Sequence, residues 1–229
     1  MRRMSSPLRQ LLAATLLLPL TAIGAKADEA TPDQAKGFYG TLGVGAAWPQ
    51  NVTGSTTALG VNANGNYSLG GGFATEVGAG YDFGVLRTEL TYLYNHATLN
   101  NLNATALGQT ITASIGDGGV NTNSVLASAY VDIPTNSRWV PYAGGGLGYT
   151  NVSWGSYSAS TRGFTLTQAS GSQGVLGYQA KLGVSYLASK STDVFVEATY
   201  QGTTGFTVGN VNYDPLSSWG ARLGARYRF

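Results

Sequence analysis

The chain lacks cysteine and is poor in charge. Its 229 residues contain no cysteine, so neither a disulfide framework nor a thiolate metal site is available. Charged residues make up 10% of the chain, well below the roughly 25% that is usual in soluble globular proteins. Histidine occurs once, as His96, which excludes a metal site built from several histidines. We therefore expect no metal and no cofactor.

Long apolar runs are missing from most of the chain. After residue 27, no segment reaches the ~20 consecutive apolar residues of a membrane-spanning helix. The shorter apolar stretch from Leu11 to Leu20 follows a basic start, Met1-Arg2-Arg3, and precedes the small-x-small site Ala25-Lys26-Ala27. That order predicts a secretory signal peptide over residues 1–27, followed by a short tail over residues 28–36.

What is present is alternation of apolar and polar side chains, clearest in the last eleven residues, 219–229. Successive side chains of a strand point to opposite faces. One face of this segment is suited to lipid and the other holds three cations, although a soluble amphipathic edge strand would give a similar pattern. The first face carries Trp219, Ala221, Leu223, Ala225, Tyr227 and Phe229, and the second carries Gly220, Arg222, Gly224, Arg226 and Arg228.

The same alternation recurs along the chain and predicts an all-β fold. Export, low charge and abundant glycine (33 residues) and tyrosine (14 residues) are together typical of a β-barrel membrane protein. Glycines at 144–146 weaken the pattern of the strand at 139–149, whose outward residues are predicted to be Trp139, Ala143, Leu147 and Tyr149. The predicted strands before the closing one are residues 38–48, 72–83, 86–94, 123–133, 139–149, 174–187 and 193–201.

Connections between these strands alternate between long and short. Polar composition predicts four long loops, at residues 49–71, 99–122, 150–173 and 203–216, and tight turns elsewhere. Long external loops and short periplasmic turns are the arrangement of outer-membrane barrels. We therefore predict an eight-stranded antiparallel up-and-down transmembrane β-barrel over residues 37–229, with the tail at 28–36 in the periplasm.

Charge is segregated between the two faces of the predicted strands. Every charged residue within them falls on the inner face, and a cation exposed at the bilayer midplane costs ~2–4 kcal/mol. The interior of an eight-stranded barrel is just wide enough to be filled by side chains, and buried charges need partners. We predict a lumen ion-pair network of Glu76, Arg87, Glu89, Lys181, Glu197, Arg222 and Arg226.

Within this network, Arg222 and Arg226 are expected to pair with Glu76, Glu89 and Glu197. The leading hypothesis is a plug of ion pairs that closes the lumen. The alternative is the lining of a narrow, gated ion path.

Aromatic residues are predicted to form a girdle at each lipid interface, where amphipathic rings are favoured. Ordinary enrichment of aromatics in strands is the alternative. The external set is Trp48, Tyr92, Tyr94, Tyr149, Tyr200 and Trp219, and the periplasmic set is Phe38, Tyr81, Trp139, Tyr186, Tyr227 and Phe229.

Signals for catalysis are weak. Glu76 and Glu89 form a carboxylate pair of the kind that glycosidases use, but two lumen acids on one hairpin give the same spacing. His96-Ala-Thr98 departs from the His-x-Ser arrangement of lipid-modifying barrels, and Gly144–Gly148 lacks the strand-loop-helix context of a phosphate loop. The sequence does not predict an exposed basic patch of the kind that nucleic-acid-binding proteins carry. We expect neither an enzyme nor a nucleic-acid-binding protein.

Short motifs in a characteristic order carry a resemblance to a known family. They are Gly37-Phe-Tyr-Gly40, Gly80-Tyr-Asp-Phe83, Tyr130-Val-Asp132, Pro141-Tyr-Ala-Gly144 with Gly148-Tyr149, and Arg226-Tyr-Arg-Phe229. Together they resemble the small outer-membrane β-barrel family that includes the opacity and surface-antigen proteins and the membrane domain of OmpA-like proteins.

The resemblance implies a monomeric barrel in the outer membrane of a Gram-negative bacterium, in contact with lipid and lipopolysaccharide. It also implies variable outer loops and folding by the barrel-assembly machinery, which would read Tyr227 and Phe229 as an assembly signal. In a surface-interaction barrel, the outer loops would bind an extracellular ligand.

Three functions remain open at this point. The first is a structural or surface-interaction barrel. The second is a narrow porin-like channel for small solutes or ions. The third is a soluble or lipid-carrying barrel of lipocalin type, which would need an apolar lumen and a polar exterior.

Overall fold

The computed structural model describes residues 35–58, 60–161 and 164–229. The predicted signal peptide and all of the predicted tail except Ala35 and Lys36 lie outside these residues. Within the described part of the chain, no helix is long and apolar enough to cross a membrane.

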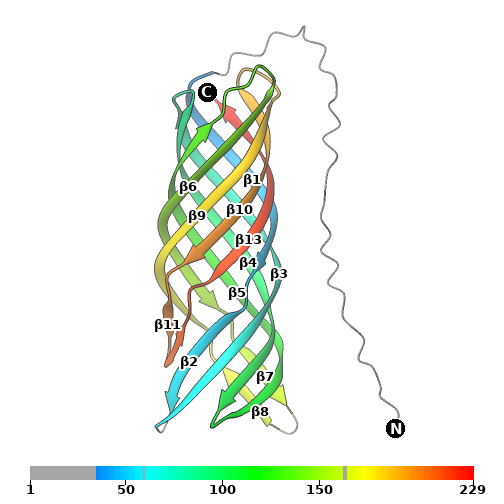
Figure 1. The fold of residues 1–229 in the computed structure, drawn as a ribbon, viewed down its shortest axis with the longest axis vertical. Helices are drawn as coiled ribbons and strands as arrows, with labels where there is room; N and C mark the ends of the chain where they lie inside the picture. The colour runs from blue at the N-terminus through cyan, green and yellow to red at the C-terminus, as the bar shows by residue number, and fades with distance from the viewer. Residues whose placement is uncertain (1–34, 59, 162–163) are drawn as a thin grey trace, which may run out of the picture. The chain divides into compact units, whose positions relative to one another are not determined.

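The regular elements of the described residues are β-strands, and Figure 1 labels most of them. In chain order they are β1 (Gly37–Pro49), β2 (Val52–Ala58), β3 (Val61–Asp82), β4 (Leu86–Ala106), β5 (Gln109–Asp132), β6 (Trp139–Trp154), β7 (Tyr157–Thr161), β8 (Phe164–Gln168), β9 (Gly171–Leu187), β10 (Thr192–Thr203), β11 (Phe206–Val208), β12 (Val211–Tyr213) and β13 (Ser217–Arg228).

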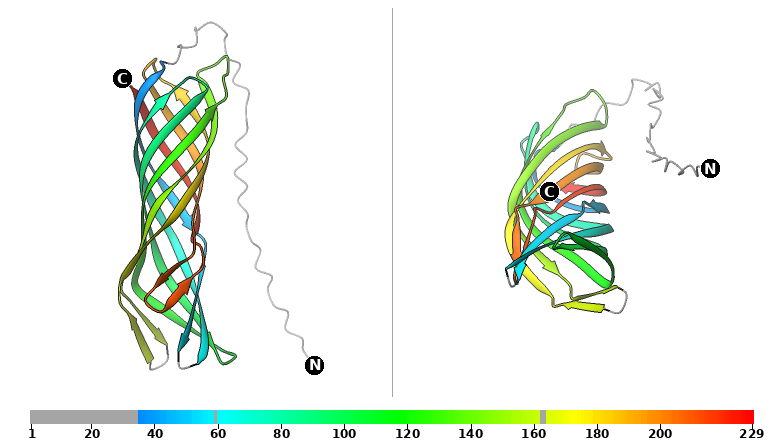
Figure 2. Two further views of the ribbon diagram at one scale, coloured as in Figure 1. Left: turned by 90° about the vertical axis from the view of Figure 1, so that its left-hand side faces the viewer. Right: turned by 60° about the horizontal axis from the view of Figure 1, so that its bottom comes forward.

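Eight of these strands close into a ring in which every neighbouring pair is antiparallel. The order around the ring is β1, β3, β4, β5, β6, β9, β10 and β13. The first and last strands of the ring pair with each other, from Tyr39 opposite Arg228 to Pro49 opposite Ser218. Figures 1 and 2 show the strands winding obliquely around the barrel wall. The predicted eight-stranded barrel is confirmed.

The two ends of the barrel differ. Short connections join β3 to β4, β5 to β6 and β9 to β10 at one end, where the amide of Phe229 also donates to the carbonyl of Phe38. We call this the turn end, and the opposite end the hairpin end. The small strands β2, β7, β8, β11 and β12 lie at the hairpin end (Figure 1).

The prediction of four long loops is wrong, because most of the residues assigned to them are in strands. The segment at 99–122, for example, is the end of β4 and the start of β5, joined by Leu107 and Gly108 with positive φ values of 51° and 75°. β2 with β3, β7 with β8, and β11 with β12 form similar hairpins in the other three segments. Ladder hydrogen bonds satisfy the backbone of these polar stretches, so their composition does not make them loops.

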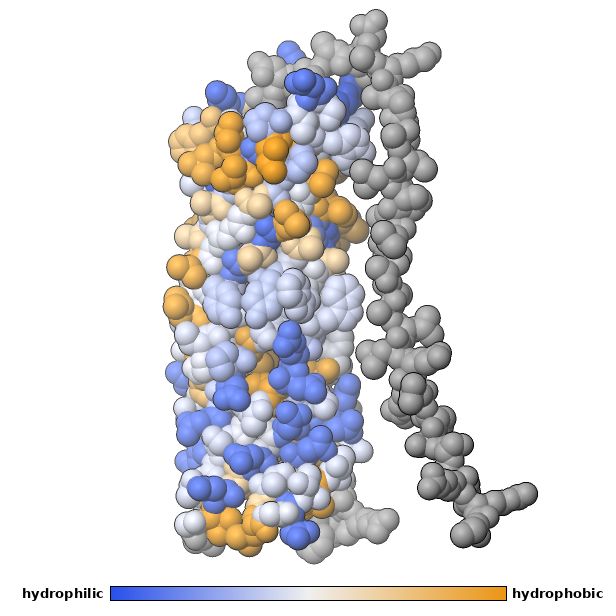
Figure 3. Space-filling view, viewed as in Figure 1, coloured by the Kyte–Doolittle hydropathy of each residue, from blue (hydrophilic) through white to orange (hydrophobic). Residues whose placement is uncertain are grey.

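The outer surface has an apolar half and a polar half. Figure 3 shows hydrophobic residues gathered towards the turn end and hydrophilic residues towards the hairpin end. Exposed aliphatic side chains cover the first half, among them Leu42, Leu90, Leu147, Leu182, Val196 and Leu223. On the second half, outward hydroxyl and amide groups pair across the hairpins, as Thr105 does with Thr110 and Thr112 with Asn103. The apolar half suits lipid and the polar half suits water.

The orientation of β6 follows the prediction. Trp139, Leu147 and Tyr149 are exposed, whereas Val140 and Tyr142 are buried in the lumen. A Cβ on Gly144 would collide with the Tyr130 ring. Glycine at this position therefore leaves room for a bulky lumen side chain on the neighbouring strand.

Candidate functional site in the layered lumen

Strand β4 runs through the whole lumen and shows how it is layered. Its inward side chains change from charged to hydroxyl, then to apolar, amide and again apolar, from the turn end towards the hairpin end. In order they are Arg87, Glu89, Thr91, Leu93, Asn95, Ala97 and Leu99. Strand alternation with a period of two places all of them on one face, so each layer of the lumen follows directly from the sequence.

The layer nearest the turn end consists of aspartates held by arginines. Arg228 Nε lies 2.9 Å from Asp82 Oδ2, and Arg228 Nη2 lies 3.0 Å from Asp193 Oδ2. Arg226 Nη1 lies 3.0 Å from the same oxygen of Asp193. These side chains are buried and come from strands β3, β10 and β13, and the pair of Arg228 with Asp82 joins residues 146 positions apart in the sequence.

Arg87 forms a second group of charged and aromatic contacts in the same part of the lumen. Its Nε and Nη2 donate to the two oxygens of Asp132 at 2.7 and 2.8 Å, which is the bidentate geometry that favours arginine over lysine. Its guanidinium carbon lies 5.0 Å from the centre of the Tyr142 ring and 5.1 Å from that of Tyr130. Aromatic faces thus surround a charge that is already paired.

The next layer joins two glutamates with two cations. Lys181 Nζ lies 2.8 Å from Glu76 Oε2 and 3.1 Å from Glu197 Oε1. Arg222 Nη1 lies 3.0 Å from Glu76 and 3.7 Å from Glu197. The hydroxyl of Tyr142 donates to the second oxygen of Glu197 at 2.8 Å. Four buried charges from β3, β9, β10 and β13 therefore meet across the lumen.

The charged layers are tightly filled. The volume open to a water molecule is about 0 Å³ in the space among Thr41, Glu76, Arg87, Glu89, Tyr130, Tyr142, Lys181, Phe195, Glu197 and Arg226.

Two of the expected pairings differ from the structure. Arg226 pairs with Asp193 rather than with a glutamate. Glu89 accepts a hydrogen bond of 2.7 Å from Thr91, and in the described residues it forms no ion pair. The carboxylate pair of Glu76 and Glu89 is also not free, because Lys181 and Arg222 hold Glu76.

Sequence reasoning omitted four members of the charged layers: Asp82, Asp132, Asp193 and Arg228. Asp82, Asp132 and Arg228 are the last residues of their strands and Asp193 is the second residue of β10, so each lies next to a short connection or the C-terminus. A signal was present, since all four fall on the predicted inner face.

An apolar core fills the lumen at the hairpin end. It was not predicted, because its aromatic residues lie in the segments predicted as loops. Trp154 stacks on Tyr213 with ring centres 4.8 Å apart, and Phe206 stacks on Tyr213 at 5.1 Å. Tyr157 donates to the hydroxyl of Tyr67 at 3.1 Å. Burial, together with this hydrogen bond, raises the pKa of the Tyr157 phenol. We call this cluster the hairpin core; its buried residues are Val52, Tyr67, Leu99, Leu102, Ile115, Val120, Val152, Trp154, Tyr157, Ala159, Phe206, Tyr213 and Leu216.

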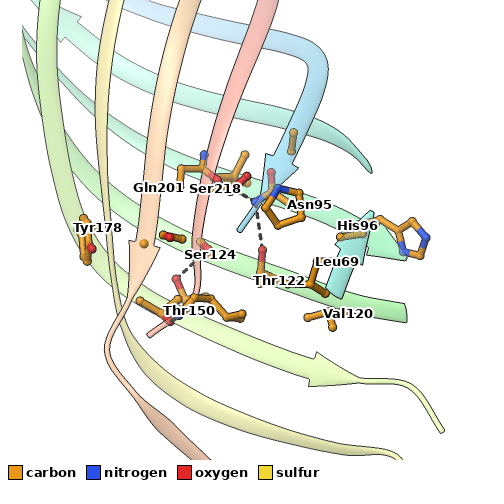
Figure 4. A pocket seen from close by; sticks show the side chains of 18 of the residues that line it. Leu69, Asn95, His96, Val120, Thr122, Ser124, Thr150, Tyr178, Gln201 and Ser218 are labelled. Carbon is orange, nitrogen blue, oxygen red and sulfur yellow. Dashed lines mark hydrogen bonds between the residues drawn. The ribbon is translucent and has the colours of Figure 1, made fainter. Parts of the chain in front are cut away.

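A cavity of about 70 Å³ separates the charged layers from the hairpin core. Figure 4 shows amide and hydroxyl side chains on its wall, with Asn95 bonded to Thr122 and Gln201. Apolar side chains, including Leu69, Leu93 and Val120, complete the lining.

Aromatic rings gather in two zones on the outer surface. At the turn end, Phe38 meets Tyr81 at 5.0 Å and Trp139 meets Tyr186 at 4.9 Å. Nearer the hairpin end, Tyr200 meets Trp219 at 4.8 Å, and Trp219 lies opposite Trp48 in the register of β13 with β1. The aliphatic surface lies between these zones, as expected for a lipid-facing wall.

The other residues that the sequence analysis singled out, His96, Tyr227 and Phe229, are not part of the charged layers. His96 Nδ1 lies 2.7 Å from Asn121 Oδ1, and its ring lies against Phe73. Tyr227 and Phe229 are exposed at the turn end with their rings 5.4 Å apart. Among the described residues, no group of three or more histidine, cysteine or acidic side chains is placed to hold a metal ion.

The family model for the outer membrane protein beta-barrel domain matches residues 13–229. The chain belongs to this family. Its location is accordingly the outer membrane of a Gram-negative bacterium.

Solved structures of this barrel class share the fold. The outer membrane protein OprG of Pseudomonas aeruginosa is 16% identical, with a TM-score of 0.51, and the match covers 88% of this chain and 99% of that one. The outer membrane protease OmpT of Escherichia coli is 9% identical, with a TM-score of 0.53, over 89% and 99% of the two chains. Likeness at this level shows the fold alone.

Curated relatives in Brucella abortus and Brucella melitensis are 32% identical over 108 residues, and both are uncharacterized. The match covers 42% of this chain and only 37% of the length of these relatives.

Proposed function

We propose that this barrel is sealed, and that it serves a structural or surface-interaction role in the outer membrane rather than transport. The observation that carries the proposal is the charged part of the lumen, where the ion pairs leave about 0 Å³ open to water. An ion that crossed it would have to separate paired charges that have no water to replace their partners. The ion-pair network thus acts as a plug.

The hairpin core supports the same proposal from the other side of the cavity. Trp154, Tyr213 and Phe206 stack across the lumen, and the cluster is apolar. A hydrated ion entering from the hairpin end would lose its water in an apolar environment. Two barriers of different chemistry therefore lie in series.

The long hairpins supply the surface for interaction. Their outward groups are hydroxyls and amides, paired across the strands as in Ser160 with Thr165 and Thr207 with Asn212. Such a surface makes hydrogen bonds without a strong charge preference. We infer that extracellular partners of the barrel contact this polar surface.

Other partners follow from the apolar half of the wall and the closing strand. We infer contact of the exposed aliphatic and aromatic belt with lipid and lipopolysaccharide, and recognition of Tyr227 and Phe229 by the barrel-assembly machinery. We also propose that the barrel works as a monomer and is not an enzyme. The likeness to a protease at 9% identity concerns the fold alone, and Lys181 and Arg222 engage Glu76 in the lumen.

Conductance of the purified protein in planar bilayers tests the seal. We expect no steps above those of the bare bilayer, because the charged layers exclude water. Regular conductance steps that require the folded barrel would instead identify a narrow porin-like channel and overturn the proposal.

Replacement of Glu197 tests the structural part of the plug. Glu197→Ala leaves Lys181 with one carboxylate and leaves the Tyr142 hydroxyl without its acceptor, so we expect the free energy of unfolding in urea to fall by about 3 kcal/mol. Asp214→Ala, which removes an exposed acid outside the lumen, is the control and should change it by less than about 0.5 kcal/mol. Equal stability of the two variants would contradict the plug.

A further inference from the structure

The cavity of about 70 Å³ lies in the lumen between two well-packed layers. On one side, Leu93 is the cross-strand neighbour of Glu76 in the charged layers. On the other side, Val120 and Leu216 belong to the hairpin core. Because the layers on both sides are tightly packed, the cavity is a defined local feature and not a sign that the whole lumen is poorly packed.

Asn95 and Gln201, on the wall of the cavity (Figure 4), each have one buried amide atom without a partner among the described residues. Asn95 Nδ2 donates to Thr122 Oγ1 at 3.1 Å and to Gln201 Oε1 at 3.0 Å. This arrangement leaves Asn95 Oδ1 and Gln201 Nε2 buried, with no hydrogen-bond partner in the described residues. An unsatisfied buried amide group costs about 1–3 kcal/mol, so the wall has an unmet requirement for one donor and one acceptor.

The remainder of the wall excludes a charged ligand. Among the described residues, the wall includes one histidine, His96, and no lysine, arginine, aspartate or glutamate. Aliphatic groups such as Leu93, Leu126 and Leu216 make up much of its surface. An ion that entered would lose its hydration without gaining an opposite charge. A neutral molecule with an apolar part would instead bury that part against these side chains.

The dimensions of the cavity limit the ligand to a small one. A volume of 70 Å³ corresponds to about two water molecules, at the ~30 Å³ that each occupies in the liquid, or to one small molecule with at most about five bonded non-hydrogen atoms. The backbone pairing has a short gap beside the cavity, because the last hydrogen bond on the β1–β13 side joins Gln50 to Ser217 and the first on the β2–β12 side joins Asp214 to Thr53.

From these features we propose that the cavity is a binding site for a small neutral amide that carries a short apolar chain. Its carbonyl accepts from Gln201 Nε2, its N–H group donates to Asn95 Oδ1, and its chain contacts the leucines of the wall. This goes beyond the proposed sealed barrel, since it gives the hairpin half of the lumen a ligand, and it does not depend on whether the charged layers conduct.

Methyl NMR of the folded, full-length mature protein in nanodiscs tests the site with propionamide as the probe. We expect saturable shifts of the Leu93, Leu126 and Leu216 methyl groups, and nuclear Overhauser effects from them to the ethyl group of the probe. Propionate has the same shape with a charge, and 2-butanone lacks the donor. Each should bind at least about tenfold more weakly, which corresponds to the loss of one satisfied buried group.

A pair of glutamine variants locates the interaction. Gln201→Met removes the donor and keeps the length of the side chain, and should weaken propionamide binding about tenfold. Gln179→Met is the matched control, because Gln179 lies directly opposite Gln201 on β9 but is not part of the cavity wall. This variant should bind as the wild type does.

Three results would overturn the proposal. They are the absence of probe contacts at the leucine methyl groups, which would indicate a cavity filled with water only, equal binding of the three probes, and unchanged binding by Gln201→Met. Heat-modifiable migration in gels, measured for each variant, shows that the barrel is folded in every comparison.

Discussion

At Arg87, several interactions converge on one guanidinium. The bidentate pair with Asp132 uses two of its nitrogens, and the rings of Tyr130 and Tyr142 lie within 5.1 Å of its central carbon. A planar fork fits both the carboxylate and the aromatic faces, whereas a lysine ammonium would satisfy neither geometry as well. The charged layers therefore depend on the shape of this side chain as well as on its charge.

Substitution of Arg87 should separate these two properties. We expect Arg87→Ala to lower the free energy of unfolding by about 3–5 kcal/mol, because Asp132 becomes a buried charge without a partner. Arg87→Lys should fall between this variant and the wild type, since the charge is kept and the bidentate contact is lost. Urea unfolding in detergent, followed by tryptophan fluorescence, measures the difference. Lys190→Ala, in the exposed connection between β9 and β10, is the control and should unfold with nearly the free energy of the wild type. If Lys190→Ala lowers the free energy of unfolding as much as Arg87→Ala does, the role assigned to the Arg87 contacts is wrong.

The sequence predicted which side chains face the lumen more reliably than which ones pair. Alternation alone places Lys181 and Glu76 inside, but β9 and β3 are not neighbours in the ring, so their contact depends on the stagger of the closed barrel. The partner of Arg226 could also have been predicted from the sequence, by extending the strand register. Once Glu197 is placed opposite Arg222, the antiparallel register also places Asp193 opposite Arg226.

Among the elements, the hairpins depart furthest from the sequence-based expectation. Asparagine, threonine, serine and glycine are common in the four segments and are typical of loops. The same residues form ladders here, with threonine pairs on the outer face and aromatic residues such as Tyr67 and Trp154 on the inner face. The inner aromatic residues come from three segments that are far apart in the sequence, so their shared core becomes visible only when the strands are aligned.

The hairpin core should decide whether these elements stay folded. Trp154 is buried, and its ring meets those of Tyr67 at 5.5 Å and Tyr213 at 4.8 Å. Trp154→Ala removes about 3–5 kcal/mol of packing, and we expect proteinase K to cleave the hairpins of this variant while the membrane-embedded half remains protected. Gel analysis of the digest of reconstituted protein gives the fragment sizes.

Trp48→Ala provides the comparison for this experiment, because Trp48 is exposed on β1. Its digest should match that of the wild type. If the hairpins of Trp154→Ala resist the protease as well as those of Trp48→Ala, their stability comes from the ladders and not from the aromatic core.

For the molecule as a whole, strand length and surface chemistry together define how it lies in the membrane. β4 has 21 residues and β5 has 24, whereas a membrane-spanning strand needs about 9–11. About half of each strand therefore extends beyond the bilayer. The polar half in Figure 3 is the half that extends, and the short connections at the turn end leave the other side almost flush with the membrane.

Cysteine labelling on cells can test this placement at three heights, because the natural chain has no cysteine to give a background. Gln109→Cys lies at an exposed hairpin tip, Leu90→Cys on the aliphatic belt, and Ser189→Cys in the connection between β9 and β10. A membrane-impermeant maleimide should label position 109 on intact cells and position 189 only after lysis. Position 90 should stay unlabelled in both cases because lipid covers it, although Leu90 is 59% exposed in the isolated barrel. Labelling of position 189 on intact cells would reverse the orientation, and labelling of position 90 would show that the aliphatic belt is not in the membrane.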